Sequence, residues 1–382
     1  MEAPLSDIRS FLDCFSSLPD PRQQSKVLYP LPEVLLLLLS ATLAGADDLV
    51  EVCGWGEEKI VFLRRFHRYR NGIPSHDTLG ALLAVLDPAV FSACFSAWID
   101  SLREAYSTEN EREIVAIDGK TSRRSHNRRR GLAPLHLLSA WACRQGMVVG
   151  QQASDGKSNE ATTIPLLLER LALDGALVSV DAAGTTTRIA RTILDRKADY
   201  LLALKGNCPA LLADTEMLFA DPDLILAQSE TDETSHGRRE HRRHVVCHDA
   251  GWINPARWES DSARFPGVRM VGMVESTVTR DGQTSRERRY YLCSAILDPL
   301  TFGRAVRSHW GIENRLHWML DVVFRDDLAR LRSANAPKNM AIIKQIALNM
   351  IRGAKPTTSF KNRRKLAGWS DEYLLNLVKD KA

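Results

Sequence analysis

Residues 113–119 are EIVAIDG, a short apolar run that ends in an aspartate and a glycine. Such a run predicts a buried strand, because strands covered on both faces are almost continuously apolar. The run ALVSVD at residues 176–181 has the same form and also ends in an acid. We therefore expect Asp118 and Asp181 at the ends of two strands of one sheet.

The segments around these two runs alternate between strand and helix patterns. Residues 135–154, LHLLSAWACRQGMVVGQQAS, predict two strands joined by a hairpin at Gly146. Helical spacing follows at residues 161–173 and 185–197, and DYLLALK at 199–205 predicts a further strand. The order strand, hairpin, helix, strand, helix, strand predicts an α/β fold with a mixed sheet and flanking helices.

The two flanks of this core have different patterns. The N-terminal part is helical, with a buried helix expected at residues 31–46, another at 57–69, and a third that Ser75 would cap. Runs at 244–253, 268–279 and 286–296 predict strands of a β-rich insertion. The expected organisation is an α-helical N-terminal domain at 1–108, a catalytic domain at 109–353 with the insertion at about 221–299, and a basic C-terminal tail at 354–382.

Composition narrows the class of protein. The chain has 382 residues, of which 44% are hydrophobic and 26% charged, as in folded proteins of several domains. Its seven cysteines are scattered without a CxxC pair, which argues against disulfides or zinc and favours a reducing cytoplasm. The start has no signal-peptide pattern, and the longest apolar run, Val34 to Ala46, is too short to span a bilayer. We expect a cytoplasmic protein without a membrane segment.

A third acid, Glu313, lies in a helical pattern at residues 304–324. The apolar residues of this helix share one stripe, and Glu313 is expected at its edge, beside the core and away from open solvent. The residues of the stripe are Ile312, Leu316, Met319 and Val323. Each acid also has an ordinary interpretation, as a turn or cap residue for the aspartates and a solvated helix residue for Glu313.

Carboxylates are the ligands that Mg²⁺ or Mn²⁺ prefers. Two such ions held by Asp118, Asp181 and Glu313 would activate water and stabilise the leaving oxygen of a phosphodiester. A freed 3′-hydroxyl could then attack a second DNA at the same site. Glu160, in KSNEATT, is interpreted as a helix-start acid that accepts backbone N–H groups, and not as a fourth ligand.

Longer motifs around these acids carry a resemblance. The blocks AIDGKTSRRS, VSVDAAGTT with YLLALKGN, and RSHWGIENRLHWMLDVVFRDD contain Asp118, Asp181 and Glu313 in turn. With SSLPDPRQ, LAGADDLVEVCGWG and GIPSHDTLGALLAVLDP near the N-terminus, they make the chain resemble the H-repeat-associated, ISAs-type transposases of bacterial insertion sequences, over nearly its whole length. In the wider group an Arg and a Lys flank the glutamate; here those positions are His309 and Leu320, so those roles are not carried over.

The resemblance implies a ribonuclease-H-like catalytic fold, a DDE transposase activity, and the three acids as catalytic metal ligands. Its partners would be the inverted repeats of the insertion sequence and target DNA. Pairing two ends suggests a homodimer, and the N-terminal domain is expected to bind the DNA end. Two alternatives stay open: an inactive or domesticated relic that only binds DNA, and a nuclease that cleaves without strand transfer.

Basic side chains near these motifs are candidate DNA contacts, because such charges hold the phosphate backbone. The alternative for each is an ordinary solvated surface. His309, Glu313 and His317 lie on one helical face, but a zinc site lacks a further ligand, so His309 is expected to contact DNA or to support the site. The candidate DNA-binding residues are Arg123, Arg124, Arg128, Arg129, Arg130, Lys205, Arg238, Arg239 and His309.

Overall fold

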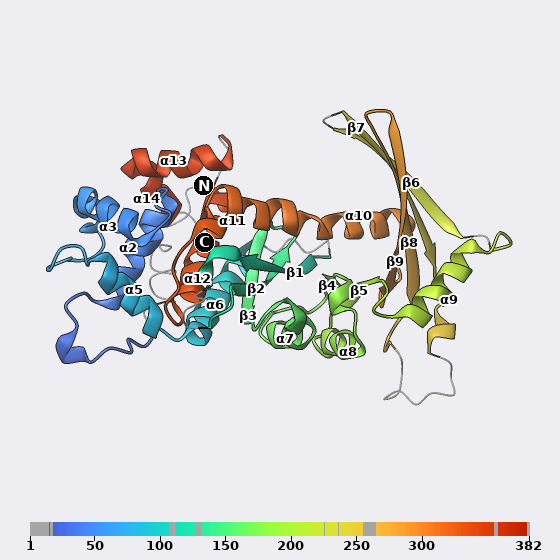
Figure 1. Cartoon of the computed structure of the whole chain (residues 1–382), viewed down its shortest axis with the longest axis horizontal. Coiled ribbons are helices and arrows are strands. Elements are labelled where there is room, and N and C mark those ends of the chain that lie inside the picture. Colours follow the sequence, from blue (N-terminus) through green and yellow to red (C-terminus); the bar gives the residue numbers. More distant parts are fainter. Residues whose placement is uncertain are drawn as a thin grey trace.

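The computed structural model describes residues 15, 18–106, 112–126, 131–224, 226–235, 237–254, 265–354 and 358–379. The molecule is elongated, with the N-terminal helices at one end, a sheet with helices on both faces in the middle, and an antiparallel β structure at the other end (Figure 1). One nine-stranded sheet continues through the middle and the β-rich end, in the order β3-β2-β1-β4-β5-β9-β8-β7-β6.

The first five strands form the catalytic half of the sheet. The strands β1, β4 and β5 are parallel, whereas β2 is antiparallel to both β1 and β3. This order and these directions are those of a ribonuclease-H-like fold, so the expected fold class is confirmed. The bounds are β1 Ile114–Ser122, β2 Leu135–Ala142, β3 Met147–Ser154, β4 Leu177–Val180 and β5 Asp199–Leu204.

The β-rich insertion extends this sheet. Its last strand, β9, pairs antiparallel with β5, so that Leu201 lies opposite Cys293. The sequence predicts three of its strands but misses β6, because AQSETDETS has no apolar alternation and is held only by pairing with β7. The bounds are β6 Ala227–Ser235, β7 Arg238–Cys247, β8 Met270–Arg280 and β9 Gln283–Cys293.

Helices cover both faces of the sheet. The helices α7, Glu160–Leu168, and α8, Thr187–Asp195, lie on one face, and α10, Pro299–His309, crosses the other (Figure 1). A π-helical turn, Glu313–His317, and α11, Trp318–Val322, continue from α10, and α9, Pro209–Ala220, leads into the insertion. The prediction of one helix around Glu313 is therefore right in place, but the helix contains a π-helical turn.

The N-terminal helices pack around a helix from the far end of the chain. The helix α12, Ala336–Gly353, contacts α2, α5, α6 and β3, and so joins the helical region to the sheet. The predicted helix at 57–69 is wrong: α3 starts at Leu49, where the Asp48 side chain accepts two N–H groups, and helix ends at Leu63. The bounds are α2 Leu31–Leu43, α3 Leu49–Glu58, α4 Ile60–Leu63, α5 His76–Val85 and α6 Pro88–Tyr106.

The segment expected to be a basic tail is folded. It contains α13, Phe360–Trp369, and α14, Asp371–Lys379. A basic tail would be expected to expose its charges to solvent or DNA, but the side chains of Arg363 and Arg364 are buried, and backbone carbonyl groups accept hydrogen bonds from both. This part of the tail prediction is wrong; Lys355 lies outside the described residues.

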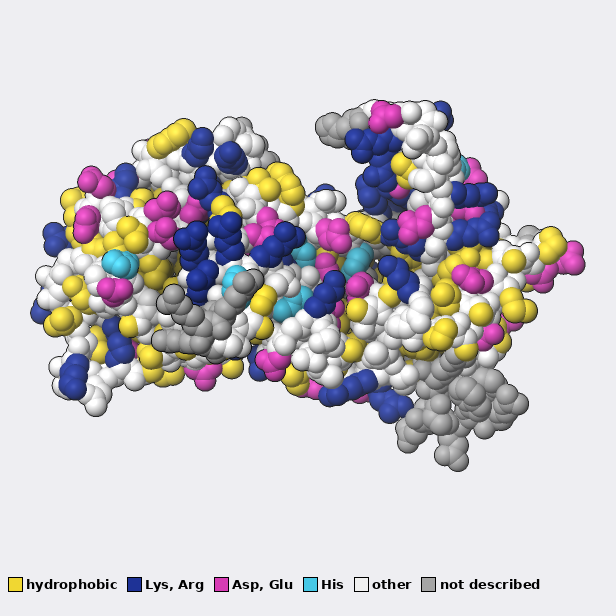
Figure 2. Space-filling model, in the orientation of Figure 1, with side chains coloured by type: hydrophobic (Ala, Val, Ile, Leu, Met, Phe, Trp, Pro, Cys, Tyr) yellow, Lys and Arg dark blue, Asp and Glu magenta, His cyan; other side chains and the backbone are white. Residues whose placement is uncertain are grey.

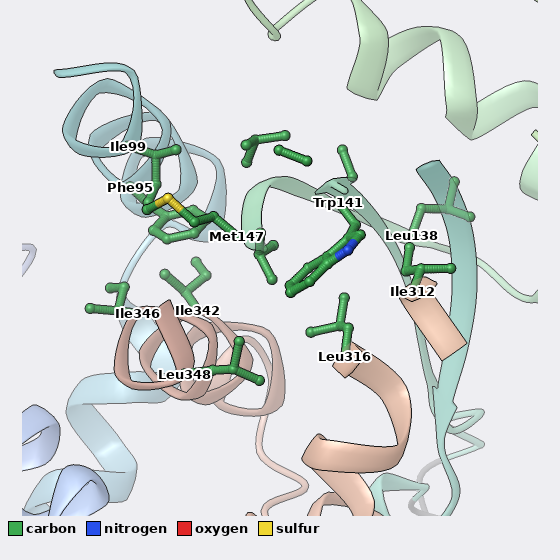
Figure 3. Packing of buried hydrophobic residues seen from close by; sticks show 14 of the residues in the cluster. Phe95, Ile99, Leu138, Trp141, Met147, Ile312, Leu316, Ile342, Ile346 and Leu348 are labelled. Carbon is green, nitrogen blue, oxygen red and sulfur yellow. The ribbon is translucent and has the colours of Figure 1, made fainter. Parts of the chain in front are cut away.

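One aromatic side chain is central to the contact between the sheet and α12. Trp141 of β2 is fully buried and lies between Met147 and the side chains of Ile312 and Leu316, with α12 below (Figure 3). The guanidinium of Arg352 stacks 4.9 Å from the Trp141 ring centroid. The helix that carries Glu313 thus packs its apolar stripe on the same side chain that anchors the edge of the sheet.

Among the described residues, no single helix is long and apolar enough to cross a membrane. The pair formed by α5 and the first part of α6 would suffice by length and composition, but it is bent by 89°.

The Arg364 guanidinium joins three parts of the chain. It donates to the carbonyl oxygens of Thr42 and Ala46 at 2.9 Å each and to that of Val323, and it pairs with the Asp47 carboxylate at 2.8 Å. We expect Arg364→Ala to lower the free energy of unfolding by about 2–4 kcal/mol, because the buried carbonyl groups and the half-buried Asp47 carboxylate lose their donor and the packed side chain leaves a cavity. Denaturant unfolding would measure this, with the exposed neighbour Lys365→Ala as the matched control. Equal stability of the two variants would contradict it.

Candidate active site

The strands β1 and β4 bring Asp118 and Asp181 together. Ile117 lies opposite Val180 in the parallel pairing, and each aspartate is the next residue. Neighbouring strands are about 4.8 Å apart, so the two carboxylates start from adjacent backbone positions. The expectation that β1 ends at Asp118 is wrong: β1 continues to Ser122, because β2 pairs with it beyond the point where β4 stops.

Asp118 is surrounded by other acids. Its Oδ1 accepts the Gly119 N–H at 2.8 Å, and the His317 Nδ1 lies 3.4 Å from its Oδ2. Burial, followed by the negative charges of Asp181, Glu313 and Glu160, raises the pKa of Asp118 to about 7. The other two candidate acids, Asp181 and Glu313, therefore both contribute to the raised pKa of Asp118.

Asp181 has two local roles. Its Oδ1 accepts the N–H groups of Ala183 and Gly184 at 3.0 and 3.3 Å, so it caps the turn that follows β4. The ordinary interpretation of Asp181 as a cap residue is therefore confirmed as well. Because both of these bonds use Oδ1, the carboxylate keeps Oδ2 for another partner while the cap fixes its orientation.

Glu313 starts the π-helical turn of the helix that crosses the sheet. The predicted apolar stripe is confirmed, since Ile312, Leu316, Met319 and Val323 are all buried. The prediction that Glu313 lies beside the core is wrong. Its side chain is exposed and lines a groove between the insertion and α10. A π-helical turn widens the helix locally and changes which side chains share a face, and such turns are common at functional sites.

The donor set suits divalent cations. Three carboxylates are hard oxygen ligands, and a bound cation would offset both the burial and the repulsion that raise the pKa of Asp118. In the described part of the chain, no three His, Cys, Asp or Glu side chains lie close enough together to hold a metal ion as they stand.

Two histidines of the helix face the sheet. The His309 Nδ1 lies 2.8 Å from the Ser179 hydroxyl of β4, and burial lowers the pKa of His309. Burial also lowers the pKa of His317 to about 4, so both rings are neutral near pH 7. His309 thus supports the helix against β4, and its expected contact with DNA stays a prediction.

The sequence misses a buried pair beside Asp118. The His136 Nε2 lies 2.7 Å from the Glu160 Oε1, and its Nδ1 lies 2.8 Å from the Thr121 hydroxyl. The interpretation of Glu160 as an acceptor of backbone N–H groups is wrong, because the carboxylate turns inward to His136. The signal in the sequence was a histidine in the otherwise apolar strand LHLLSAWA.

A second network joins β1 to the segment after α11. The Lys120 ammonium lies 2.7 Å from the Asp321 carboxylate and within 3.4 Å of the carboxylates of Asp326 and Asp327. Lys344 of α12 pairs with Asp326 at 2.8 Å. These pairs hold the extended half of β1 against the helix that carries Glu313.

The predicted DNA-binding residues after β1 are only partly described. Arg123 is 82% exposed but lies 3.4 Å from the Asp327 carboxylate, and Arg124 is exposed. Arg128, Arg129 and Arg130 lie outside the described residues.

The candidate residues of the sheet lie at different places. Lys205 is exposed and directly follows β5, the strand that pairs with β4. Arg238 lines a groove between the insertion and α10, whereas Arg239 faces the other side, because neighbouring side chains alternate along a strand. The pair therefore cannot contact the same stretch of a ligand.

This groove has a volume of about 620 Å³ and reaches from β7, β8 and β9 to Glu313. Its arginines are held by acids: Arg242 pairs with Glu240 at 2.7 Å and Arg307 with Glu233 at 2.9 Å. The guanidinium of Arg289 stacks 4.7 Å from the Trp310 ring. Figure 2 shows Lys and Arg side chains gathered over the insertion strands and in a band near α11.

Comparison with known proteins finds matches over almost the whole chain. Residues 109–350 match the family model described as "Transposase DDE domain", and residues 12–99 match the one described as "DDE_Tnp_1-associated". The chain is 36% identical to the putative transposase YncI of Escherichia coli O157:H7, covering 96% of this chain and 94% of that protein.

A further relative and a solved structure are also similar. The H repeat-associated putative transposase YhhI of Escherichia coli K12 is 32% identical, over 97% of this chain and 98% of that protein. A piggyBac transposase synaptic complex with hairpin DNA is 10% identical with a TM-score of 0.41, covering 99% of this chain and 80% of that one.

Gly119 leaves room for the buried pair. A Cβ at Gly119 would lie 2.4 Å from the Glu160 Oε1 and 2.6 Å from the His136 Nε2. We expect Gly119→Ala to lower the free energy of unfolding by about 1–3 kcal/mol, because the pair must shift. Gly54→Ala, in exposed helix with nothing within 4 Å, should instead stabilise by about 1 kcal/mol. Thermal unfolding of both variants checks this, and matching shifts would contradict it.

The raised pKa of Asp118 makes stability depend on pH. Between the ordinary pKa of 3.8 and about 7, the folded state keeps the proton that the unfolded state has lost, so stability falls as pH rises. In metal-free buffer, Asp118→Asn should therefore melt above the wild type at pH 8, and the gap should narrow towards pH 4. Calorimetry across this range tests the assignment; a gap independent of pH would refute it.

Proposed function

Because the chain belongs to the family of transposases with a DDE domain and is a DNA transposase, we propose that Asp118, Asp181 and Glu313 are its catalytic acids. One observation carries the assignment: Asp118 and Asp181 directly follow the paired residues Ile117 and Val180 of two neighbouring strands, and the charges of Asp181 and Glu313 both contribute to the raised pKa of the half-buried Asp118. These side chains come from two parallel strands and a helix that crosses the same face of the sheet. Two other acids near Asp118 already have partners, because His136 engages Glu160 and Lys120 engages Asp321.

Transposases of this family use divalent metal ions, and we assign two ions, Mg²⁺ or Mn²⁺, to the three acids. When bound, they would activate water and stabilise the oxygen that leaves the phosphorus. The chain supplies the ionised carboxylates, and the cap at Asp181 and the Gly119 N–H orient two of them. Neutral His317 beside Asp118 adds no positive charge that would compete with a cation.

The reaction has two steps at one site. Water attacks the phosphorus at the end of the element, the bond to the 3′ oxygen breaks, and a 3′-hydroxyl is released. That hydroxyl then attacks target DNA, forming a new phosphodiester and releasing a 3′-hydroxyl of the target. The first step hydrolyses one phosphodiester to a 3′-hydroxyl and a 5′-phosphate, the second exchanges one phosphodiester for another, and neither needs a covalent protein intermediate.

The basic residues around the acids suit the DNA backbone. We assign phosphate contacts to Arg123, Arg124, Lys205, Arg238 and Arg239, and extend them to Arg128, Arg129 and Arg130. The groove from the insertion to Glu313 suits the DNA close to the cut, because acids hold its arginines in fixed positions. Its mixed charge favours one defined placement of the DNA over purely electrostatic binding.

Three wider assignments accompany this function. The N-terminal helical domain binds the end of the element, the protein acts in the bacterial cytoplasm, and a homodimer pairs the two ends. An inactive relic that only binds DNA is the alternative. The intact set of three acids favours the enzyme over this relic, and the N-terminal helices and the insertion favour a transposase over a simple nuclease.

Asp181→Asn should abolish cleavage while DNA binding stays nearly unchanged, because the variant loses a metal ligand and no phosphate contact. The assay uses duplexes of the element's own terminal repeats with Mg²⁺, and compares wild type, Asp181→Asn, Asp118→Ala and the control Asp195→Asn on the far end of α8. Undiminished turnover of Asp181→Asn would refute the assignment.

The products separate the alternatives. Cleavage followed by joining supports the transposase, binding without cleavage by the wild type supports the relic, and cleavage of any DNA without joining supports a nuclease.

A further inference from the structure

The turn after α4 carries a concentrated positive charge that lies far from the acids. Residues 59–71, KIVFLRRFHRYRN, contain five Lys or Arg residues and no acid. The side chains of Arg64, Arg65, Arg68 and Arg70 are exposed. This turn belongs to the N-terminal helices, at the end of the molecule opposite the insertion (Figure 1).

The turn is held rigidly. Tyr69 adopts a left-handed backbone conformation with φ of 44°, which is strained for a bulky side chain. The buried Glu33 of α2 compensates, because its carboxylate accepts the Tyr69 N–H at 2.9 Å and its carbonyl accepts the Tyr69 hydroxyl at 2.7 Å. The Asn71 side chain donates to the Leu28 carbonyl at 2.6 Å. Strain that surrounding contacts maintain in this way is typical of functional segments.

A groove of about 560 Å³ lies beside the turn. His67, Arg68, Arg70 and Asn71 line one part of it, and the buried Glu33 lies at its base. Burial lowers the pKa of His67, and its Nε2 has no hydrogen-bond partner among the described atoms. The groove therefore presents two exposed arginines along one hollow, whereas the His67 Nε2 and Glu33 are buried beneath them.

These arginines differ from those of the insertion. Arg242 of the insertion and Arg307 of α10, which line the groove there, are neutralised by Glu240 and Glu233. No ion pair joins Arg64, Arg65, Arg68 or Arg70 to an acid within the described ranges. Exposed arginines on a strained turn, without an ion-pair partner in the described ranges, favour an anionic partner over an ordinary solvated surface.

We propose that this groove is a second DNA-binding site, in which Arg68 and Arg70 contact the phosphate backbone of duplex DNA away from the cut. The proposal rests on the transposase function and gives a specific site to the N-terminal domain. Its contacts are to phosphates, so it positions the duplex and does not read its sequence. Together with the insertion, it would hold DNA at both ends of the elongated chain.

The test measures binding of the full-length protein to a fluorescein-labelled duplex of arbitrary sequence, in EDTA, across a salt series. Arg68→Gln with Arg70→Gln is compared with wild type. The matched control is Arg188→Gln with Lys197→Gln, two exposed basic residues at the ends of α8. Thermal melting confirms that both variants are folded.

The variant should bind more weakly, and the slope of log K against log salt should flatten by about 1.8, since each lost phosphate contact removes about 0.9. A duplex with the element's terminal repeat should lose affinity by the same factor. The control should match wild type.

An unchanged slope in the Arg68 and Arg70 variant overturns the proposal, as does a loss confined to the terminal repeat, which would mean sequence reading. Weakened binding of poly-glutamate with unchanged binding of DNA would assign the groove to an acidic protein and overturn it too. If the wild type fails to cleave element ends, the proposed function is contradicted. The binding test is done in EDTA and does not depend on cleavage, so it still decides whether the groove binds DNA.

Discussion

Repulsion between neighbouring carboxylates is the constraint on which the rest of this structure depends. Parallel pairing of β1 with β4 forces Asp118 and Asp181 side by side, and the crossing helix adds Glu313. Burial, followed by the negative charges of Asp181 and Glu313, raises the pKa of Asp118 to about 7, so the ionised carboxylate is costly to hold here without a counter-ion. A fold that relaxed this strain by letting the strands separate would also lose the place where cations bind.

The frame around the acids resists that separation at three points. Lys120 and Lys344 link β1 and α12 through Asp326, and Trp141 packs the glutamate helix against the sheet edge. Arg364 joins the end of that helix to α2. The C-terminal helices and α12 thus belong physically to both the N-terminal region and the catalytic sheet, although the sequence places them far from α2.

The sequence predicted the catalytic sheet well, because its strands carry their own signal. EIVAIDG and ALVSVD are apolar runs with terminal acids, and Gly146 marks the hairpin. It failed where tertiary contacts decide: β6 is polar and exists only through β7, and Glu160 turns to His136 instead of the backbone. The π-helical turn that exposes Glu313 has no periodic signature, and the burial of Arg364 depends on carbonyls contributed by α2 and α11.

The pairing of β9 with β5 also determines how the sheet ends. Without the insertion, β5 would be an open apolar edge, able to pair with a strand of another molecule. The added strands move the free edge outward to β6, whose sequence AQSETDETS is acidic and contains no large apolar side chain. The negative charges of two such edges would repel each other. The strand β6, which the sequence did not predict, therefore protects the protein from edge-to-edge aggregation.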